Sequence, residues 1–145
     1  MYSHIRNEVR TEGIFARARE SGKEIYFPRV SGESLTFHRV KSLGDLKPGS
    51  FGVPEPDPGS VSIEPRNLDL IVVPASAVDP GGSRIGYGKG FYDRLLVNIP
   101  IERRIGAVYG FQVLDAVPVG EYDQAVGIIT TELGVIFCGR LEGGT

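Results

Sequence analysis

One glycine-rich segment, residues 84–94, combines residue types that could hold phosphate. Its glycines occupy alternate positions, at Gly86, Gly88 and Gly90. Without Cβ atoms to clash, such a backbone can turn its N–H groups toward anionic oxygens, and Lys89 would add a cation. Arg84 could add a planar set of donors at the start of the segment. We interpret the segment as a candidate phosphate loop, and the alternative is that both cations are simply solvated.

Two familiar phosphate-loop patterns do not fit this segment. The Walker pattern needs a glycine where this chain has Ser83 and a serine or threonine where it has Gly90. The dinucleotide-binding pattern needs a third glycine at the position of Phe91. With 20 glycines in 145 residues, alternating glycines alone are weak evidence. The pattern by itself leaves both phosphate binding and a plain turn open.

A carboxylate follows the loop directly. Asp93 is expected in the first turn of a helix, close to any phosphate that the loop binds. A bare carboxylate would repel phosphate there unless a cation lay between them. Mg²⁺ typically binds one or two carboxylates together with phosphate oxygens, which makes Asp93 a candidate metal ligand. The alternative is a favourable interaction of Asp93 with the helix dipole.

The elements that would position these residues alternate between strands and helices. Apolar and β-branched runs predict strands over residues 2–5, 24–30, 35–40, 70–73, 104–109, 126–130 and 135–138. Helices are predicted over residues 12–21, with Thr11 as N-cap, and over residues 90–97. Five prolines between residues 47 and 65 predict an extended surface loop. The order indicates an α/β domain with a largely parallel sheet and an antiparallel portion, with the glycine loop beyond a strand's carboxyl end.

Composition narrows the classes of function. The length suits one domain, and a formal net charge of −2 disfavours nucleic-acid binding. The sequence has no apolar run of bilayer length and no signal-peptide core at its start, so we expect no membrane association and a cytoplasmic location. The lone cysteine, Cys138, is expected to be a buried thiol without a catalytic role. His4 and His38 show no metal-ligand spacing, so no zinc site is assigned.

The glycine loop and several other segments together resemble one known family. The segments are residues 69–74 (DLIVVP), 84–95, 6–9 with Thr11, 51–56 (FGVPEP), and Asp123 followed by residues 128–132 (IITTE). In order and spacing they resemble the signature of the 5-formyltetrahydrofolate cyclo-ligase family, also called methenyltetrahydrofolate synthetases. The resemblance covers nearly the whole chain. It implies a three-layer, Rossmann-like cyclo-ligase fold and a single domain over residues 1–145.

The resemblance also implies an activity. Members convert 5-formyltetrahydrofolate to 5,10-methenyltetrahydrofolate with ATP and Mg²⁺, releasing ADP and phosphate. The formyl oxygen attacks the γ-phosphate, and N10 of the folate then closes the ring and expels phosphate. No protein nucleophile is required, so catalysis is by positioning and electrostatics, and no catalytic residue is named.

The same resemblance assigns site residues. ATP would contact Arg84, Ile85, Gly86, Tyr87, Gly88, Lys89, Gly90, Phe91 and Tyr92, with Lys89 and Arg84 as phosphate contacts. Folate would contact Ser3, Glu8, Tyr87 and Phe91, and the metal would be held by Asp93 and Asp123. Aromatic core packing is the alternative for Tyr87 and Phe91, and a solvated turn acid is the alternative for Glu8. Nothing in the residues around Asp123 would have indicated it.

One part of the family pattern has no counterpart in the sequence. Family members usually open with a helical segment carrying a basic Lys-x-x-Leu-Arg motif that helps to hold ATP. Its absence leaves open an upstream start codon, a shortened gene, or a partner that supplies the missing groups. The alternative function is a truncated homologue that binds folate or nucleotide without efficient turnover, and an unrelated nucleotide-binding domain is a third possibility. Otherwise we expect a monomer acting on small molecules.

Overall fold

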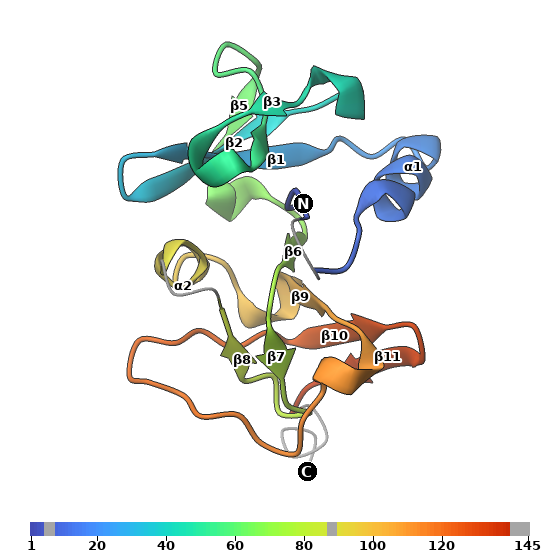
Figure 1. The fold of residues 1–145 in the computed structure, drawn as a ribbon, viewed down its shortest axis with the longest axis vertical. Coiled ribbons are helices and arrows are strands. Elements are labelled where there is room, and N and C mark those ends of the chain that lie inside the picture. Colours follow the sequence, from blue (N-terminus) through green and yellow to red (C-terminus); the bar gives the residue numbers. More distant parts are fainter. Residues whose placement is uncertain (5–7, 87–89, 140–145) are drawn as a thin grey trace. The chain divides into compact units, whose positions relative to one another are not determined.

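The computed structural model describes residues 1–4, 8–86 and 90–139. The chain divides into two compact units, Met1–Leu68 and Asp69–Thr145, which are described separately below. Figure 1 shows the elements of each unit, coloured along the sequence. Tyr87, Gly88 and Lys89 lie outside the described residues. The expectation of a single cyclo-ligase-like domain stays a prediction.

Unit 1 contains an antiparallel sheet with the strand order β1-β2-β5. The strands are β1 (Tyr26–Ser31), β2 (Ser34–Arg39) and β5 (Ser62–Ile63). The strands predicted over residues 24–30 and 35–40 are confirmed as β1 and β2, which pair antiparallel with Tyr26 opposite Arg39 and Ser31 opposite Ser34. Helix α1 (Glu12–Glu20) buries Phe15 against Phe27 of β1, with ring centroids 6.0 Å apart. Helix and sheet therefore share one small apolar core.

The start of unit 1 differs from the sequence-based expectation. Residues 1–4 form no strand, so the strand predicted over residues 2–5 is wrong for its described part. Thr11 is the N-cap of α1, as predicted, but its side chain makes no capping hydrogen bond. Its hydroxyl instead donates to the carbonyl oxygen of Tyr2 at 3.0 Å. This hydrogen bond connects the N-terminal residues to the start of α1. A side-chain contact, and not strand pairing, therefore positions Tyr2.

The proline-rich segment contains more structure than the predicted loop. After a short 3₁₀ turn (Leu43–Asp45), β3 (Lys47–Pro48) and β4 (Pro54–Glu55) pair antiparallel around a second turn (Ser50–Gly52). Two-residue pairs tolerate proline because few ladder hydrogen bonds are needed. The buried Glu55 carboxylate accepts a hydrogen bond from the backbone N–H of Val30 at 2.9 Å, linking β4 to β1. A third turn (Pro65–Asn67) ends the unit.

Unit 2 contains a four-stranded sheet with the order β11-β10-β9-β6. Strands β6 (Ile71–Val73), β9 (Arg104–Ala107) and β10 (Ile128–Thr131) are parallel, and β11 (Gly134–Phe137) pairs antiparallel with β10. A largely parallel sheet with an antiparallel portion is therefore confirmed, as is the α/β class.

Helix α2 (Phe91–Leu96) lies in the connection from β6 to β9 and buries Leu96 completely. Short 3₁₀ turns flank β9, at Ile101–Arg103 and Gly110–Gln112. Because parallel neighbours need a crossover connection, the chain that returns from β6 to β9 must pass over the sheet. In the described parts of the chain no helix combines the length and apolar character that crossing a bilayer requires.

A small hairpin between β6 and the glycine loop was not predicted. It consists of β7 (Ala77–Val78) and β8 (Arg84–Ile85), joined through a turn in which Asp79 accepts hydrogen bonds from the N–H groups of Gly81 and Ser83. The alternating glycines therefore follow β8, the second strand of this hairpin. The hairpin separates them from the parallel strand β6.

Candidate functional site

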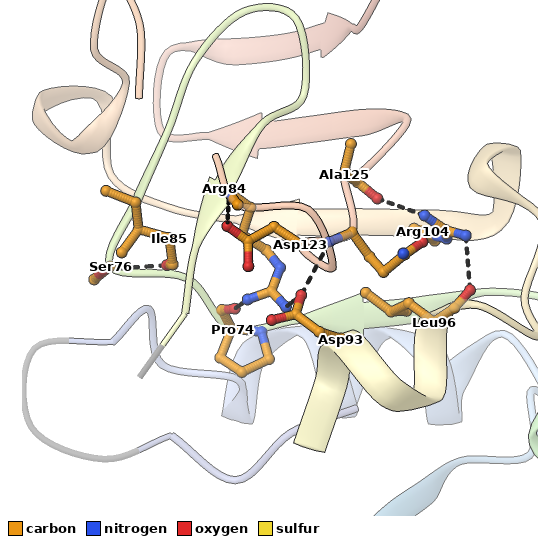
Figure 2. Close-up of polar contacts among 11 residues, drawn as sticks. Pro74, Ser76, Arg84, Ile85, Asp93, Leu96, Arg104, Asp123 and Ala125 are labelled. Carbon is orange, nitrogen blue, oxygen red and sulfur yellow. Dashed lines mark hydrogen bonds and ion pairs between the residues drawn. The ribbon is translucent and has the colours of Figure 1, made fainter. Parts of the chain in front are cut away.

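The described part of the predicted loop is organised around a buried arginine. Arg84, the first residue of β8, has a side chain only 2% exposed. Its Nη1 donates to the carbonyl oxygen of Pro74 at 3.4 Å, at the end of β6, and its Nη2 donates to Oδ1 of Asp93 at 3.1 Å (Figure 2). The buried Nε has no hydrogen-bond partner among the described residues. The guanidinium thus joins the sheet to helix α2.

Asp93 lies in the first turn of α2, as predicted, and its carboxylate is held from two sides. Besides Arg84, the backbone N–H of Gln124 donates to Oδ1 at 3.1 Å. The Asp93 side chain is 25% exposed, and its Oδ2 has no hydrogen-bond partner among the described residues. One oxygen of this carboxylate is therefore fixed, and the other has no hydrogen-bond partner within residues 1–4, 8–86 and 90–139.

Gly90 sets the direction in which α2 leaves the loop. It is the N-cap of α2 with φ 73° and ψ 7°, in the left-handed region that favours glycine. A Cβ at this position would also lie 2.9 Å from Nη1 of Arg94. This glycine is therefore required by the backbone, independently of any ligand.

Asp123 lies beside the same arginine although it is 30 positions further along the chain than Asp93. Its Oδ2 accepts a hydrogen bond from the N–H of Gly120 at 2.6 Å, within an exposed turn before β10. The next residue, Gln124, supplies the N–H that binds Asp93. The two predicted metal ligands thus belong to one polar cluster, in which the guanidinium of Arg84 is the shared cation (Figure 2).

Burial and the neighbouring acids act on Arg84 in opposite directions. Burial is the larger effect and lowers the pKa of the guanidinium, while Asp93, Tyr92 and Asp123 raise it. A guanidinium stays protonated in proteins, so the cluster keeps its central positive charge.

Gly86 makes room for this guanidinium. A Cβ at position 86 would lie 2.8 Å from Nη1 of Arg84, closer than carbon and nitrogen can approach without displacement. At least one of the alternating glycines therefore lies against an internal side chain, which would have to shift if the glycine were replaced by alanine.

A second buried arginine, Arg104, was not identified from the sequence. Its side chain donates to three backbone carbonyl oxygens: Leu96 at 2.7 Å, Ala125 at 2.8 Å and Ile99 at 2.9 Å. Arg104 thereby ties the end of α2 to the segment that carries Asp123 and Gln124 (Figure 2). Burial, as the largest cause, lowers its pKa. No residue type in the sequence could have revealed it, because all three acceptors are backbone carbonyl oxygens, which every residue has.

The cluster provides the donor types that a hard divalent ion needs. Among the described residues there is no group of three or more His, Cys, Asp or Glu side chains arranged for a metal. Two carboxylates nonetheless fit Mg²⁺, which takes one or two carboxylates and completes its shell with phosphate oxygens and water. The observation that supports this fit is that Oδ2 of Asp93 has no partner in the described part of the chain, while its Oδ1 is held by two donors.

The remaining predicted residues fall into three groups. Ile85, Phe91 and Tyr92 are half-buried in unit 2, and the Arg94 guanidinium lies 5.2 Å from the centre of the Phe91 ring. Ser3 and Glu8 belong to unit 1, where the Ser3 hydroxyl donates to the carbonyl oxygen of Pro54 at 2.8 Å. Glu8 is only 7% exposed, which contradicts the solvated-acid alternative. Tyr87, Gly88 and Lys89 lie outside the described residues.

Unit 1 also contains a hollow of about 630 Å³ whose lining includes Arg29, Lys41 and Lys47 as well as Asp45 and Asp57. None of the predicted site residues in the described ranges lines it.

The fold places this chain in the α/β class, with a mainly parallel sheet in unit 2. An arginine–carboxylate cluster lies next to the segment that contains the alternating glycines. Residues 1–132 match the model of the 5-formyltetrahydrofolate cyclo-ligase family. The chain is therefore a member of that family, as the sequence motifs predicted.

Individual relatives agree with this placement. The chain is 30% identical over 139 residues to a probable 5-formyltetrahydrofolate cyclo-ligase of Caenorhabditis elegans, covering 85% of this chain and 66% of the relative. It is 31% identical over 125 residues to the enzyme of that name from Mycolicibacterium smegmatis, covering 81% and 64%. The solved structure of Aquifex aeolicus 5,10-methenyltetrahydrofolate synthetase matches with a TM-score of 0.82 and 35% identity, over 95% of this chain and 70% of that one. The chain thus spans about two thirds of the length of these relatives.

Proposed function

We propose that this protein catalyses the ATP-dependent conversion of 5-formyltetrahydrofolate to 5,10-methenyltetrahydrofolate. Family membership supports the reaction class, and one structural observation supports the site. Asp93 and Asp123, distant in sequence, meet at Arg84 directly beside the glycine-rich loop. Mg²⁺ at a phosphate site is usually bound by one or two carboxylates together with phosphate oxygens, and these two residues would supply them.

The proposed reaction proceeds in two substrate-centred steps. The formyl oxygen attacks the γ-phosphorus of ATP, a new O–P bond forms, and ADP leaves. N10 of the folate then attacks the formyl carbon, the carbon–oxygen bond to phosphate breaks, and N10 loses its proton. Both steps depend on alignment and on neutralising charge, so no residue of the protein needs to form a covalent bond.

The residues have corresponding proposed roles. The loop from Arg84 to Tyr92 holds the nucleotide, with Lys89 as a phosphate contact. Asp93 and Asp123 would hold Mg²⁺, which when bound supplies charge neutralisation at the phosphate oxygens. Ser3 and Glu8, with Tyr87 and Phe91, are the proposed folate contacts. A carboxylate as buried as Glu8 suits a fixed hydrogen-bond acceptor better than a solvated surface group.

The test is the absorbance rise of the methenyl product with 5-formyltetrahydrofolate, ATP and Mg²⁺. We expect product with the parent chain and with Asp115→Asn, an exposed aspartate of the same unit, as matched control. Asp93→Asn should reduce the rate and the Mg²⁺ dependence together. Binding of folate or nucleotide without product would contradict the proposed reaction and favour the non-catalytic alternative.

A further inference from the structure

We propose that Arg84 is a positioning residue for Asp93 and not a direct contact of the phosphates. This inference rests on the proposed function, because it concerns how the nucleotide site is built. It replaces the simpler expectation that every cation of the glycine-rich segment binds phosphate.

The direction of the Arg84 side chain is the first argument. Its guanidinium donates inward, to the Pro74 carbonyl and to Asp93, and its side chain is 2% exposed. A phosphate ligand would have to displace these partners or enter the interior of unit 2. The exposed part of the cluster is instead its carboxylate side, where Asp93 is 25% exposed.

The second argument is the asymmetry of the Asp93 carboxylate. Two donors, Nη2 of Arg84 and the N–H of Gln124, both bind Oδ1 at 3.1 Å. Two hydrogen bonds to one oxygen fix the carboxylate plane and leave Oδ2 as the oxygen available to a metal ion. Partners behind a metal-binding side chain commonly act in this way, by orienting the ligand that touches the ion.

The third argument is charge. Asp93 and Asp123 both lie beside the guanidinium of Arg84. Arg84 therefore reduces the repulsion between the two acids and lets both carboxylates stay ionised near one another. Lysine could supply the charge but not the planar pair of donors that reaches Pro74 and Asp93 together.

Gly86 allows the same contact to be perturbed without changing any charge. An added Cβ would lie 2.8 Å from Nη1, and no positive φ makes the backbone at position 86 unfavourable for alanine. Gly86→Ala should therefore move the guanidinium away from Asp93 while Arg84 itself is retained.

The experiment is calorimetric titration with ADP, first in the presence of EDTA and then across a series of Mg²⁺ concentrations. The variants are Arg84→Lys and Gly86→Ala, with Arg103→Lys, an exposed arginine of the same unit, as matched control. For Arg84→Lys we expect ADP affinity without metal to stay within about two-fold of the parent; Gly86 belongs to the proposed nucleotide loop, so Gly86→Ala is compared through its Mg²⁺ affinity alone. The apparent affinity for Mg²⁺ in the presence of ADP should fall by about 10- to 100-fold, the usual effect of losing an orienting partner. A matching loss of metal-free ADP affinity in Arg84→Lys would overturn the proposal.

A double-mutant comparison separates this inference from the proposed function. If Arg84 acts through Asp93, then adding Arg84→Lys to Asp93→Asn should cause no further loss of Mg²⁺ dependence. An additive loss would contradict the positioning role alone. A parent protein that binds ADP with no Mg²⁺ dependence would instead contradict the proposed metal site. If Arg84→Lys does not fold, Gly86→Ala combined with Asp93→Asn decides the question, because an additive loss of Mg²⁺ dependence would contradict the positioning role.

Discussion

Replacing Arg104 by methionine should destabilise unit 2 strongly. Methionine keeps much of the side-chain volume but removes three hydrogen bonds of 2.7 to 2.9 Å from a charged donor. Arg104 is 8% exposed, so the carbonyl oxygens of Leu96, Ile99 and Ala125 would lose these bonds where little water can replace them. At about 1.5 kcal/mol each, the low end for a charged donor, the bonds amount to about 4 to 5 kcal/mol. Because burying the guanidinium itself costs free energy, we expect a net loss of about 3 kcal/mol.

The assay is urea unfolding followed by far-UV circular dichroism and by the fluorescence of the six tyrosines, which no tryptophan obscures. Arg103→Met is the matched control, because Arg103 is the exposed neighbour of Arg104. We expect this control to change the unfolding free energy by less than about 0.5 kcal/mol. Equal effects of the two substitutions would refute the reasoning. Arg104→Lys, which can restore only part of the three-way contact, should fall between them.

Other expectations follow from single residues. Gly90→Ala should lower the unfolding free energy by about 1 to 2 kcal/mol. Alanine disfavours φ 73°, and its Cβ would lie too close to the Arg94 guanidinium. An unchanged urea midpoint would contradict this. Burial raises the pKa of the Cys138 thiol. At pH 8 the folded protein should therefore react with Ellman's reagent far more slowly than the protein unfolded in urea. Equal rates for the folded and unfolded protein would exclude a protected thiol. The hydrogen bond from Arg10 is the largest cause of a lowered Glu12 pKa, so this contact stabilises the fold above the ordinary carboxyl pKa. That stability is lost as pH falls through the lowered pKa. NMR titration of Arg10→Ala should show a higher Glu12 pKa than in the parent, and an unchanged pKa would contradict this.

The sheet and helices of the fold could largely be predicted from sequence because their signals are local. Residues 71–73 form an apolar β-branched run, and β1 and β2 are joined across a glycine turn. The hairpin β7–β8 escaped prediction because strands of two residues carry no periodic pattern. The turn at Asp79, with Pro80, Gly81 and Gly82, was the signal that could have indicated it.

The candidate site was only partly accessible to sequence reasoning. Asp93 could be predicted because it directly follows a glycine-rich loop, whereas Asp123 was reached only through the family resemblance. The burial of Arg84 could not be foreseen, because it depends on the Pro74 carbonyl and on a carboxylate nine positions away. Pairwise contacts of that kind are set by tertiary packing, which residue type and spacing do not encode.

The close approach of Gly86 to Arg84 amounts to a steric rule linking two positions of the chain. In a library randomised at both positions and selected for folding, side chains at position 86 should be recovered mainly with residues smaller than arginine at position 84. Arginine at 84 should in turn be recovered mainly with glycine at 86, even when no nucleotide is present during selection. Part of what is read as a ligand-binding signature in such loops would then record the internal packing of a cation, and would persist in a relative that had lost the ligand.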